Sequence, residues 1–174
     1  MGPLRVLVNS AGIGWAQRTV GKDGSYDSAA NLDAFKKVIA INLIGSFDCI
    51  RLAATAMSVT EPLEYGERGA IVNIASVAGL TVFSPGGTVY SGTKFAVRAI
   101  SEGLRHEVGG SIRTTTIEPG AVDSELKFGS SHQQSRDFVV DFYKHAIPAQ
   151  SVARAIAFAI EQPAERDHLT QRDH

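Results

Sequence analysis

The segment Ala70-Ile71-Val72-Asn73-Ile74-Ala75-Ser76, near the middle of the chain, carries the strongest structural signal in the sequence. Its continuous apolar run with β-branched residues is typical of a strand buried on both faces of a sheet. A turn at Gly66-Glu67-Arg68-Gly69 precedes the run, and the hydroxyl of Ser76 follows it. We therefore predict a central strand over Ala70–Ala75 that presents a polar side chain at its carboxyl end.

Two further strands are predicted, one on each side of this segment in the sequence. Leu4–Val8 is a short apolar run that leads into the glycine-containing turn Asn9-Ser10-Ala11-Gly12. Ile112–Ile117 is rich in β-branched residues and ends before Pro119-Gly120. Polar or small residues thus follow all three strands at their carboxyl ends.

Helical patterns separate the strands. The first begins after Asn31, a favourable N-cap residue, and runs to about Ser58 with a break expected near Asn42; its apolar positions are Leu32, Phe35, Val38, Ile39, Leu43 and Phe47. The second ends at Gly109-Gly110 and repeats at Val89, Val97, Ile100, Leu104 and Val108. A third, ending before Pro163, is marked by Val152, Ile156, Ala159 and Ile160.

This alternation of strands and helices predicts an α/β fold: a three-layer, Rossmann-like parallel sheet with flanking helices and right-handed crossovers. Ligands of such sheets bind at the carboxyl ends of the strands. We predict one domain over residues 1–163. Residues 164–174 are polar and aperiodic, which favours a disordered tail.

Composition narrows the function classes. The 174 residues include 17 basic and 18 acidic side chains, for a formal net charge of -1, and 44% are hydrophobic. This balance gives no electrostatic case for binding nucleic acid or a membrane surface. The single cysteine, Cys49, excludes an intramolecular disulfide and a multi-cysteine zinc site. The lone cysteine fits a reducing compartment, so we predict a cytoplasmic protein. We find no signal-peptide core and no run of about 20 apolar residues.

Tyr90 and Lys94 are the chemically most informative pair. They lie four residues apart at the start of the second helix, so they share one helix face. An ammonium group beside a phenol favours the phenolate and is expected to lower its pKa. A phenol tuned in this way acts as a general acid or base.

Several motifs, taken in the order in which they occur along the chain, resemble the classical short-chain dehydrogenase/reductase family. They are Asn9-Ser10-Ala11-Gly12, Asn42 in Ile-Asn-Leu-Ile-Gly, Ser76, Tyr90-Ser91-Gly92-Thr93-Lys94, and Pro119-Gly120-Ala121-Val122-Asp123-Ser124. The resemblance runs from Leu4 to Pro163. The early part is most similar to the 3-hydroxyacyl-CoA dehydrogenases related to 17β-hydroxysteroid dehydrogenase type 10, and the part after Ser76 to broad-range carbonyl reductases.

The resemblance implies a NAD(P)-dependent oxidoreductase that interconverts a ketone and a secondary alcohol, with NAD and NADP left open. Tyr90 would be the general acid/base, Lys94 would lower its pKa and hold the nicotinamide ribose, and Ser76 would hydrogen-bond the carbonyl. Asn42 would seat a water that relays protons. The cofactor would lie along Asn9, Gly12, Tyr90, Lys94, Pro119, Gly120 and Ser124.

The sequence also departs from the family pattern. The family opens with a strand, a Gly-x-x-x-Gly-x-Gly turn and two more strand-helix units, whereas this chain starts at the equivalent of the fourth strand and lacks the closing strand. We therefore expect a domain truncated at both ends, without the glycine-rich phosphate loop. The bare apolar edge at Leu4–Val8 predicts a homo-oligomer, and by resemblance the two long helices would form its interface.

Two other functions use the same residues. Ser91-Gly92-Thr93-Lys94 has the Ser-x-x-Lys spacing of hydrolases in which a lysine activates a serine, so a cofactor-independent esterase with Ser91 or Ser76 as nucleophile is one alternative. An inactive oligomeric scaffold is the other.

The remaining candidates have simpler interpretations. Cys49 is expected to be a buried structural thiol, and Trp15 a packed loop aromatic rather than part of a cleft. By position, the segment Phe128–His145 corresponds to the family's substrate lid. We propose no metal site, because the histidines show no ligand spacing; they are His106, His132, His145, His168 and His174.

Overall fold

The computed structural model describes residues 2–82, 86–128 and 143–163. Its main sheet has three parallel strands in the order β1 (Val6–Asn9), β2 (Gly69–Ile74) and β3 (Ile112–Ile117). Asn9 pairs with Asn73, and Ile74 pairs with Ile117, so the strands finish at one end of the sheet. The three predicted strands are confirmed, with β1 starting two residues later than expected.

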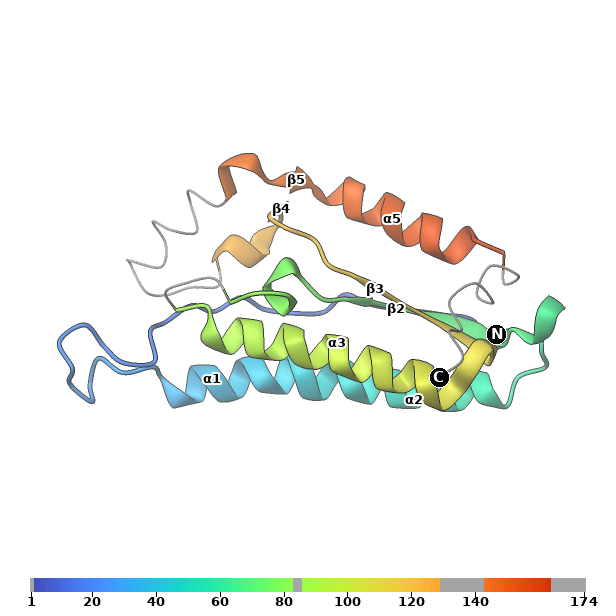
Figure 1. Ribbon diagram of the computed structural model, residues 1–174, viewed down its shortest axis with the longest axis horizontal. Coiled ribbons are helices and arrows are strands. Elements are labelled where there is room, and N and C mark those ends of the chain that lie inside the picture. Colours follow the sequence, from blue (N-terminus) through green and yellow to red (C-terminus); the bar gives the residue numbers. More distant parts are fainter. Residues whose placement is uncertain (1, 83–85, 129–142, 164–174) are drawn as a thin grey trace.

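Helices cover both faces of this sheet (Figure 1). One face is covered by α1 (Leu32–Ile39), η1 (Ala40–Gly45), α2 (Ser46–Ser58) and α3 (Thr88–Val108), and the other by α5 (Ala149–Glu161). The predicted three-layer α/β fold is confirmed. Short 3-10 helices complete the order at Glu64–Gly66, Val77–Gly79, Gly109–Ser111, Glu125–Phe128 and Tyr143–His145.

The first long helix has a side-chain cap and an internal irregularity. The Asn31 side chain accepts a hydrogen bond from the Ala34 N–H at 2.8 Å, which confirms the predicted N-cap. The break expected near Asn42 is a π-helical turn over Ala40–Gly45, so the helical run continues through it. The turn leaves Asn42 buried, in contact with the backbone of Ile13 in the loop after β1.

This run, Leu32–Ser58, is also long and apolar enough to cross a membrane by length and composition. The sequence prediction that no segment meets that criterion is therefore wrong. In the structure, one stripe of the run packs against β1 and α3 and includes the polar side chains of Asn42 and Ser46. Charged side chains occupy other positions of the same run, which gives it the pattern of an amphipathic helix on a sheet.

The core lies between β2, β3 and the helices α2 and α3. Its most deeply buried members include Ile71, Ile112 and Met57. At Gly69 a Cβ would come within 2.7 Å of the Met57 Sδ and 2.8 Å of the Arg5 carbonyl oxygen, so the close approach of α2 to the start of β2 requires glycine. Such density makes this end of the sheet sensitive to one added methyl group.

An ion pair fixes α5 at the other face of the sheet. Arg113, near the start of β3, pairs with the carboxylate of Glu67 at 3.1 Å, and both side chains are close to nine-tenths buried. The same guanidinium donates to the carbonyl oxygens of Ala159 and Ile160 at 2.9 Å each. Arg113 thus satisfies carbonyls in the last turn of α5 and ties that helix to β3.

Several features differ from the sequence predictions. A second, two-stranded parallel sheet joins β4 (Val122–Asp123) to β5 (Ile147–Pro148), and strands this short carry no periodic pattern. Cys49 is exposed, so its prediction as a buried thiol is wrong: it lies on the outward face of α2. Trp15 is buried, as predicted. The predicted tail at 164–174 and most of the predicted lid, 129–142, lie outside the described residues.

Candidate active site

A cavity of about 550 Å³ opens at the carboxyl ends of β1, β2 and β3, beside α5. This is the position expected for a ligand site of a parallel α/β sheet. Seven of the predicted site residues line it: Gly12, Ser76, Tyr90, Lys94, Pro119, Gly120 and Ser124. The predicted residues Asn9 and Asn42 are not in its lining.

Ser76 follows β2 and is held by the backbone around it. Its Oγ accepts a hydrogen bond from the Ala78 N–H at 3.1 Å and lies 3.4 Å from the carbonyl oxygen of Pro119, to which it donates. The Val77 N–H donates to the same Pro119 oxygen at 3.0 Å. The loop after β3 therefore fixes the loop after β2, and with it the position of the serine.

Tyr90 stands in the first turn of α3, and its phenol lies near enough to the Ser76 side chain to be influenced by it. Burial raises the pKa of Tyr90 to about 12, and the neighbouring Ser76 side chain offsets part of that rise. The expected lowering of this pKa is therefore wrong, because desolvation of the phenolate is the largest effect and the nearby Tyr143 adds to the rise. At neutral pH the group is a neutral phenol.

Lys94 is buried one helical turn further along α3. Its Nζ donates to the carbonyl oxygen of Ile74, the last residue of β2, at 2.8 Å and lies 5.7 Å from the centre of the Tyr90 ring. Burial lowers the pKa of Lys94 to about 8. The two side chains share a helix face, as predicted, but the ammonium points at a strand carbonyl rather than at the phenol oxygen.

Asn42 forms the support behind this pair. Its Oδ1 accepts from the Ile13 N–H at 2.8 Å, and its Nδ2 donates to the Ile13 carbonyl at 2.9 Å. A weaker contact at 3.4 Å joins Nδ2 to the Thr93 hydroxyl. The π-helical turn thus pins the loop after β1 beside α3. The water that the resemblance assigns to Asn42 stays a prediction.

Two predicted cofactor residues, Asn9 at the end of β1 and Gly12 in the loop after it, have different surroundings. Asn9 turns inward and donates from Nδ2 to the Ser46 carbonyl of α2 at 2.9 Å. Gly12 faces the cavity, where a Cβ would come 3.8 Å from the Lys94 Nζ and 3.5 Å from the Asn42 Oδ1. The absence of a side chain at Gly12 keeps the space beside the ammonium open.

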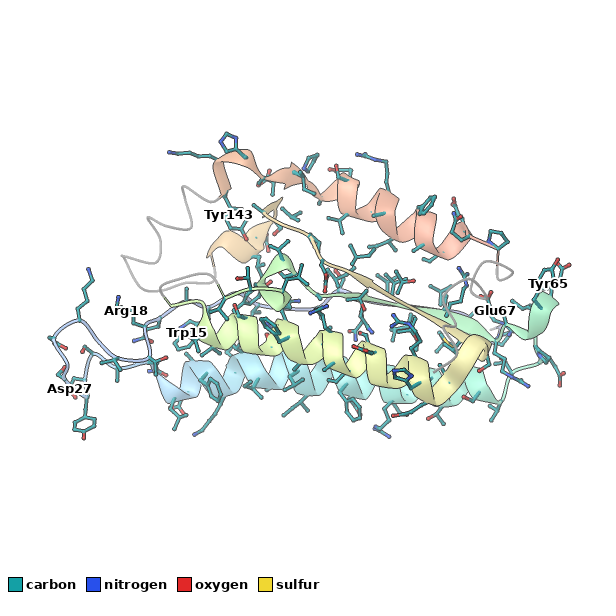
Figure 2. All side chains as sticks on the ribbon, in the orientation of Figure 1. Trp15, Arg18, Asp27, Tyr65, Glu67 and Tyr143 are labelled. Carbon is teal, nitrogen blue, oxygen red and sulfur yellow. The ribbon has the colours of Figure 1, made fainter. Side chains whose placement is uncertain are left out.

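Tyr143 belongs to the segment Phe128–His145 that the resemblance assigns to the substrate lid. It lines the cavity on the α5 side, at the end of the molecule where the strands finish (Figure 2). Burial raises the pKa of its phenol. Sequence reasoning missed the rest of this wall. Glu125 and one face of α5, with Val152 and Ile156, complete the wall. The helix period indicated an apolar face for α5, but only the tertiary structure shows what that face covers.

Ser91 does not reach the cavity. It is 1% exposed on α3, it is not in the cavity lining, and its hydroxyl has no hydrogen-bond partner among residues 2–82, 86–128 and 143–163. It therefore lacks the access that a nucleophile needs. Within the same ranges, no group of three or more histidine, cysteine, aspartate or glutamate side chains is placed to hold a metal ion.

The chemistry of the cavity fits the nicotinamide riboside end of a nicotinamide nucleotide. Hydroxyl groups of Ser124 and Tyr90 and the ammonium of Lys94 are suited to a ribose, and Gly12 and Gly120 leave room for a flat ring. Apolar side chains of α5 form the opposite wall. A mixed wall of this kind orients a ligand through few polar contacts.

Comparisons with known proteins agree with this geometry. The family model for short chain dehydrogenases matches residues 1–135. An oxidoreductase of Staphylococcus saprophyticus, described as uncharacterized, is 39% identical over 167 residues, covering 94% of this chain and 62% of that protein. The crystal structure of 3-hydroxyacyl-CoA dehydrogenase type-2 from Mycobacterium avium aligns with a TM-score of 0.74 and 32% identity, over 92% of this chain and 62% of that one.

A third match is the closed form of a serine dehydrogenase complexed with NADP+, with a TM-score of 0.70 and 26% identity over 92% of this chain and 60% of that one. The chain thus spans about three fifths of the length of the relatives it matches. The family model covers more than half of the chain, and seven of the nine site residues of the resemblance line one cavity. The chain belongs to the short chain dehydrogenase family.

Proposed function

We propose that this chain carries the proton-handling part of a NAD(P)-dependent oxidoreductase that interconverts a ketone and a secondary alcohol. The observation that carries the proposal is the gathering of Ser76, Tyr90 and, one helical turn later, Lys94 in the lining of a single cavity at the carboxyl end of the sheet. The family and the NADP+-bound relative support a nicotinamide cofactor in general.

In this proposal the nicotinamide supplies or accepts the hydride. Ser76 donates a hydrogen bond to the substrate oxygen and orients the carbonyl. Tyr90 transfers its phenolic proton to that oxygen as the carbonyl becomes an alcohol, so it acts as the general acid. Because its pKa is about 12, the group holds its proton at neutral pH, and the free protein is prepared for reduction of a ketone.

Lys94, Gly12 and Ser124 would hold the nicotinamide ribose beside Tyr90. Nothing in these residues distinguishes NAD from NADP, since the contact that reads the ribose 2′ position belongs to a part of the family pattern outside this match. The substrate would be a small molecule with a ketone or a secondary hydroxyl, which fits the cavity volume of about 550 Å³.

We further propose that the chain forms a homo-oligomer through α2 and α3. Apolar side chains are exposed on α2, with Phe47 at 50% and Leu52 at 54%. A surface hollow lies between the two helices and is lined by Phe47, Ile100 and Val108. Sedimentation velocity is the test: Phe47→Asp should reduce the oligomer to a monomer, and a monomeric wild type would exclude this interface. A cytoplasmic location is retained as a proposal from cysteine use alone.

Isothermal titration with NADPH and then NADH tests the cofactor proposal directly. We expect saturable binding of at least one nucleotide, and reduction of small ketones that is lost in Tyr90→Phe. Absence of binding at millimolar nucleotide would reject the dehydrogenase function for this chain and leave two alternatives, the scaffold and an esterase with Ser76 as nucleophile. The esterase alternative with Ser91 has no geometric support, because that hydroxyl does not line the cavity.

A further inference from the structure

Arg98 lies one turn beyond Lys94 on α3, outside the cavity lining. Its Nε is 2.6 Å from the Oε1 of Glu118, and its Nη1 donates to the carbonyl oxygen of Gly79 at 3.2 Å. Glu118 belongs to the loop after β3, and Gly79 to the loop after β2. One guanidinium therefore joins α3 to both loops.

Gly79 closes the loop that starts at Ser76. Its N–H donates to the Ser76 carbonyl at 2.8 Å, and a Cβ at this position would lie 2.8 Å from the Lys94 carbonyl oxygen of α3. The loop thus packs directly on the backbone of the helix that carries Tyr90. A small displacement of this loop changes the separation of the Ser76 and Tyr90 side chains.

Glu118 precedes the residue whose carbonyl oxygen accepts a hydrogen bond from the Ser76 hydroxyl. The next residue, Pro119, accepts hydrogen bonds through its carbonyl oxygen from the Val77 N–H and from the Ser76 hydroxyl. Rotation of the Glu118–Pro119 segment would move that acceptor. The pairing of Glu118 with Arg98 restrains the segment relative to α3.

We propose that Arg98 is a positioning residue that sets the Ser76 hydroxyl against the Tyr90 phenol by clamping the Gly79 and Glu118 loops onto α3. The consequence for turnover rests on the proposed function; the geometric claim does not. The guanidinium is 43% exposed, and ion pairs with that much solvent contribute little to global stability. Its effect is therefore expected in the alignment of the two hydroxyl groups.

The experiment compares Arg98→Ala, Arg98→Lys and the matched control Arg105→Ala in the full chain. Arg105 lies two turns further along α3 and donates from Nη2 to the Thr114 carbonyl of β3 at 3.0 Å. The control therefore removes another arginine-to-carbonyl bond from the same helix, away from Ser76. Arg98→Lys keeps the positive charge next to Glu118.

We expect Arg98→Ala to lower kcat for ketone reduction by roughly 10-fold with KM changed less than about twofold, since small misplacements of reacting groups cost rate rather than affinity. Arg98→Lys should recover most of the loss, and Arg105→Ala should behave like wild type. The melting temperatures of all three variants should agree within a few degrees. Equal kcat in Arg98→Ala and Arg105→Ala would overturn the proposal.

A second readout needs no turnover. The chain has four tyrosines, so ¹³Cζ-tyrosine NMR at pH 7 resolves Tyr90, with Tyr90→Phe giving its assignment and Ser76→Ala the signal without the neighbouring serine hydroxyl. Arg98→Ala should move the Tyr90 signal toward the Ser76→Ala position, whereas Arg105→Ala should not. If the wild type reduces no ketone, the proposed function fails while this measurement still decides the clamp; an unmoved signal overturns the clamp itself.

Discussion

Two buried cations lie at opposite ends of the three-stranded sheet, and their surroundings differ. At the amino end, Arg113 is paired with Glu67 and also donates to two carbonyls of α5. At the carboxyl end, Lys94 donates to one carbonyl, that of Ile74, and burial lowers its pKa to about 8. Arg113 has acceptors for a positive charge that it keeps at every pH of interest. Lys94 has one acceptor, and its positive charge can be lost near neutral pH.

The amino end of the sheet therefore holds a stabilising ion pair, whereas the carboxyl end holds a titratable group at the candidate site. A guanidinium stays protonated in proteins, so burying Arg113 requires a full set of acceptors. A lysine with few partners instead shifts its pKa toward neutrality, and this is common at functional sites. Similar burial of a cation thus stabilises the fold at one end and prepares a site at the other.

The largest stability effect is expected at the amino end. Arg113→Ala leaves the buried carboxylate of Glu67 without its partner and frees two carbonyls of α5, so the free energy of unfolding should fall by about 3 kcal/mol or more. Urea denaturation of wild type and variant measures this loss of unfolding free energy. Arg113→Met combined with Glu67→Gln should lose less than Arg113→Ala alone; an equal or larger loss in the double variant would show that the unpaired charge is not the cause.

The largest activity effect is expected at the carboxyl end. Tyr90→Phe removes the proton donor and should lower the rate of ketone reduction by about 100-fold or more. Its unfolding free energy should change by far less than that of Arg113→Ala, since one partly satisfied hydroxyl is lost. Steady-state kinetics and urea titration of the same preparation check both parts. Undiminished turnover would remove Tyr90 from the mechanism.

A smaller effect tests the packing beneath the site. Gly79→Ala places a methyl group 2.8 Å from the Lys94 carbonyl, so we expect a loss of about 1–3 kcal/mol in unfolding free energy. Gly92→Ala, on the same helix as Lys94 but facing open space, is the control and should be neutral or slightly stabilising. Thermal melting distinguishes the two, and equal stability of both variants would mean that the loop moves freely.

The pH dependence of stability tests the Lys94 side of the comparison by titration. The Lys94 pKa is about 8 in the folded chain and 10.5 in a fully solvated lysine, so between these values the unfolded chain binds more protons and the unfolding free energy rises with pH. The slope is at most about 1.4 kcal/mol per pH unit. Above pH 10 Tyr90 acts in the opposite direction, because the folded phenol keeps its proton up to about pH 12.

Lys94→Met isolates the lysine contribution. Urea midpoints at pH 7, 8, 9 and 10 should show that the variant lacks the part of the rise between pH 8 and 10 that wild type displays. If both proteins have the same pH dependence over this range, Lys94 is not buried as a titrating cation, and the contrast with Arg113 does not hold.

Much of the fold could be predicted from residue patterns. The three strands, the N-cap at Asn31 and the end of α3 before Gly109 follow from local rules: β-branched runs form strands, an asparagine caps a helix, and a glycine at φ 54° terminates one. The two-residue strands β4 and β5 could not be predicted, since so few residues have no period. The exposure of Cys49 depended on which face of α2 meets the sheet.

The sequence predicted which residues belong to the candidate site better than it predicted the direction of their pKa shifts. Ser76, Tyr90 and Lys94 meet at one cavity because parallel strands end together and α3 returns across them. The direction of the Tyr90 pKa was predicted wrongly, since helical spacing places Lys94 nearby but does not reveal desolvation. Residue patterns indicated the apolar face of α5 and the position of the lid segment that contains Tyr143, but not that both would line the same cavity.

Residue order alone specified the succession of elements and the chemical groups at the strand ends, because periodicity and turn residues act over short distances along the chain. Which of those groups are desolvated, and to what each is bonded, emerged only when the chain was folded. Burial depends on contacts between residues far apart in sequence, as between Lys94 and Ile74 or between Arg113 and Glu67. Those long-range contacts separate the charge that stabilises this sheet from the charge that titrates at its carboxyl end.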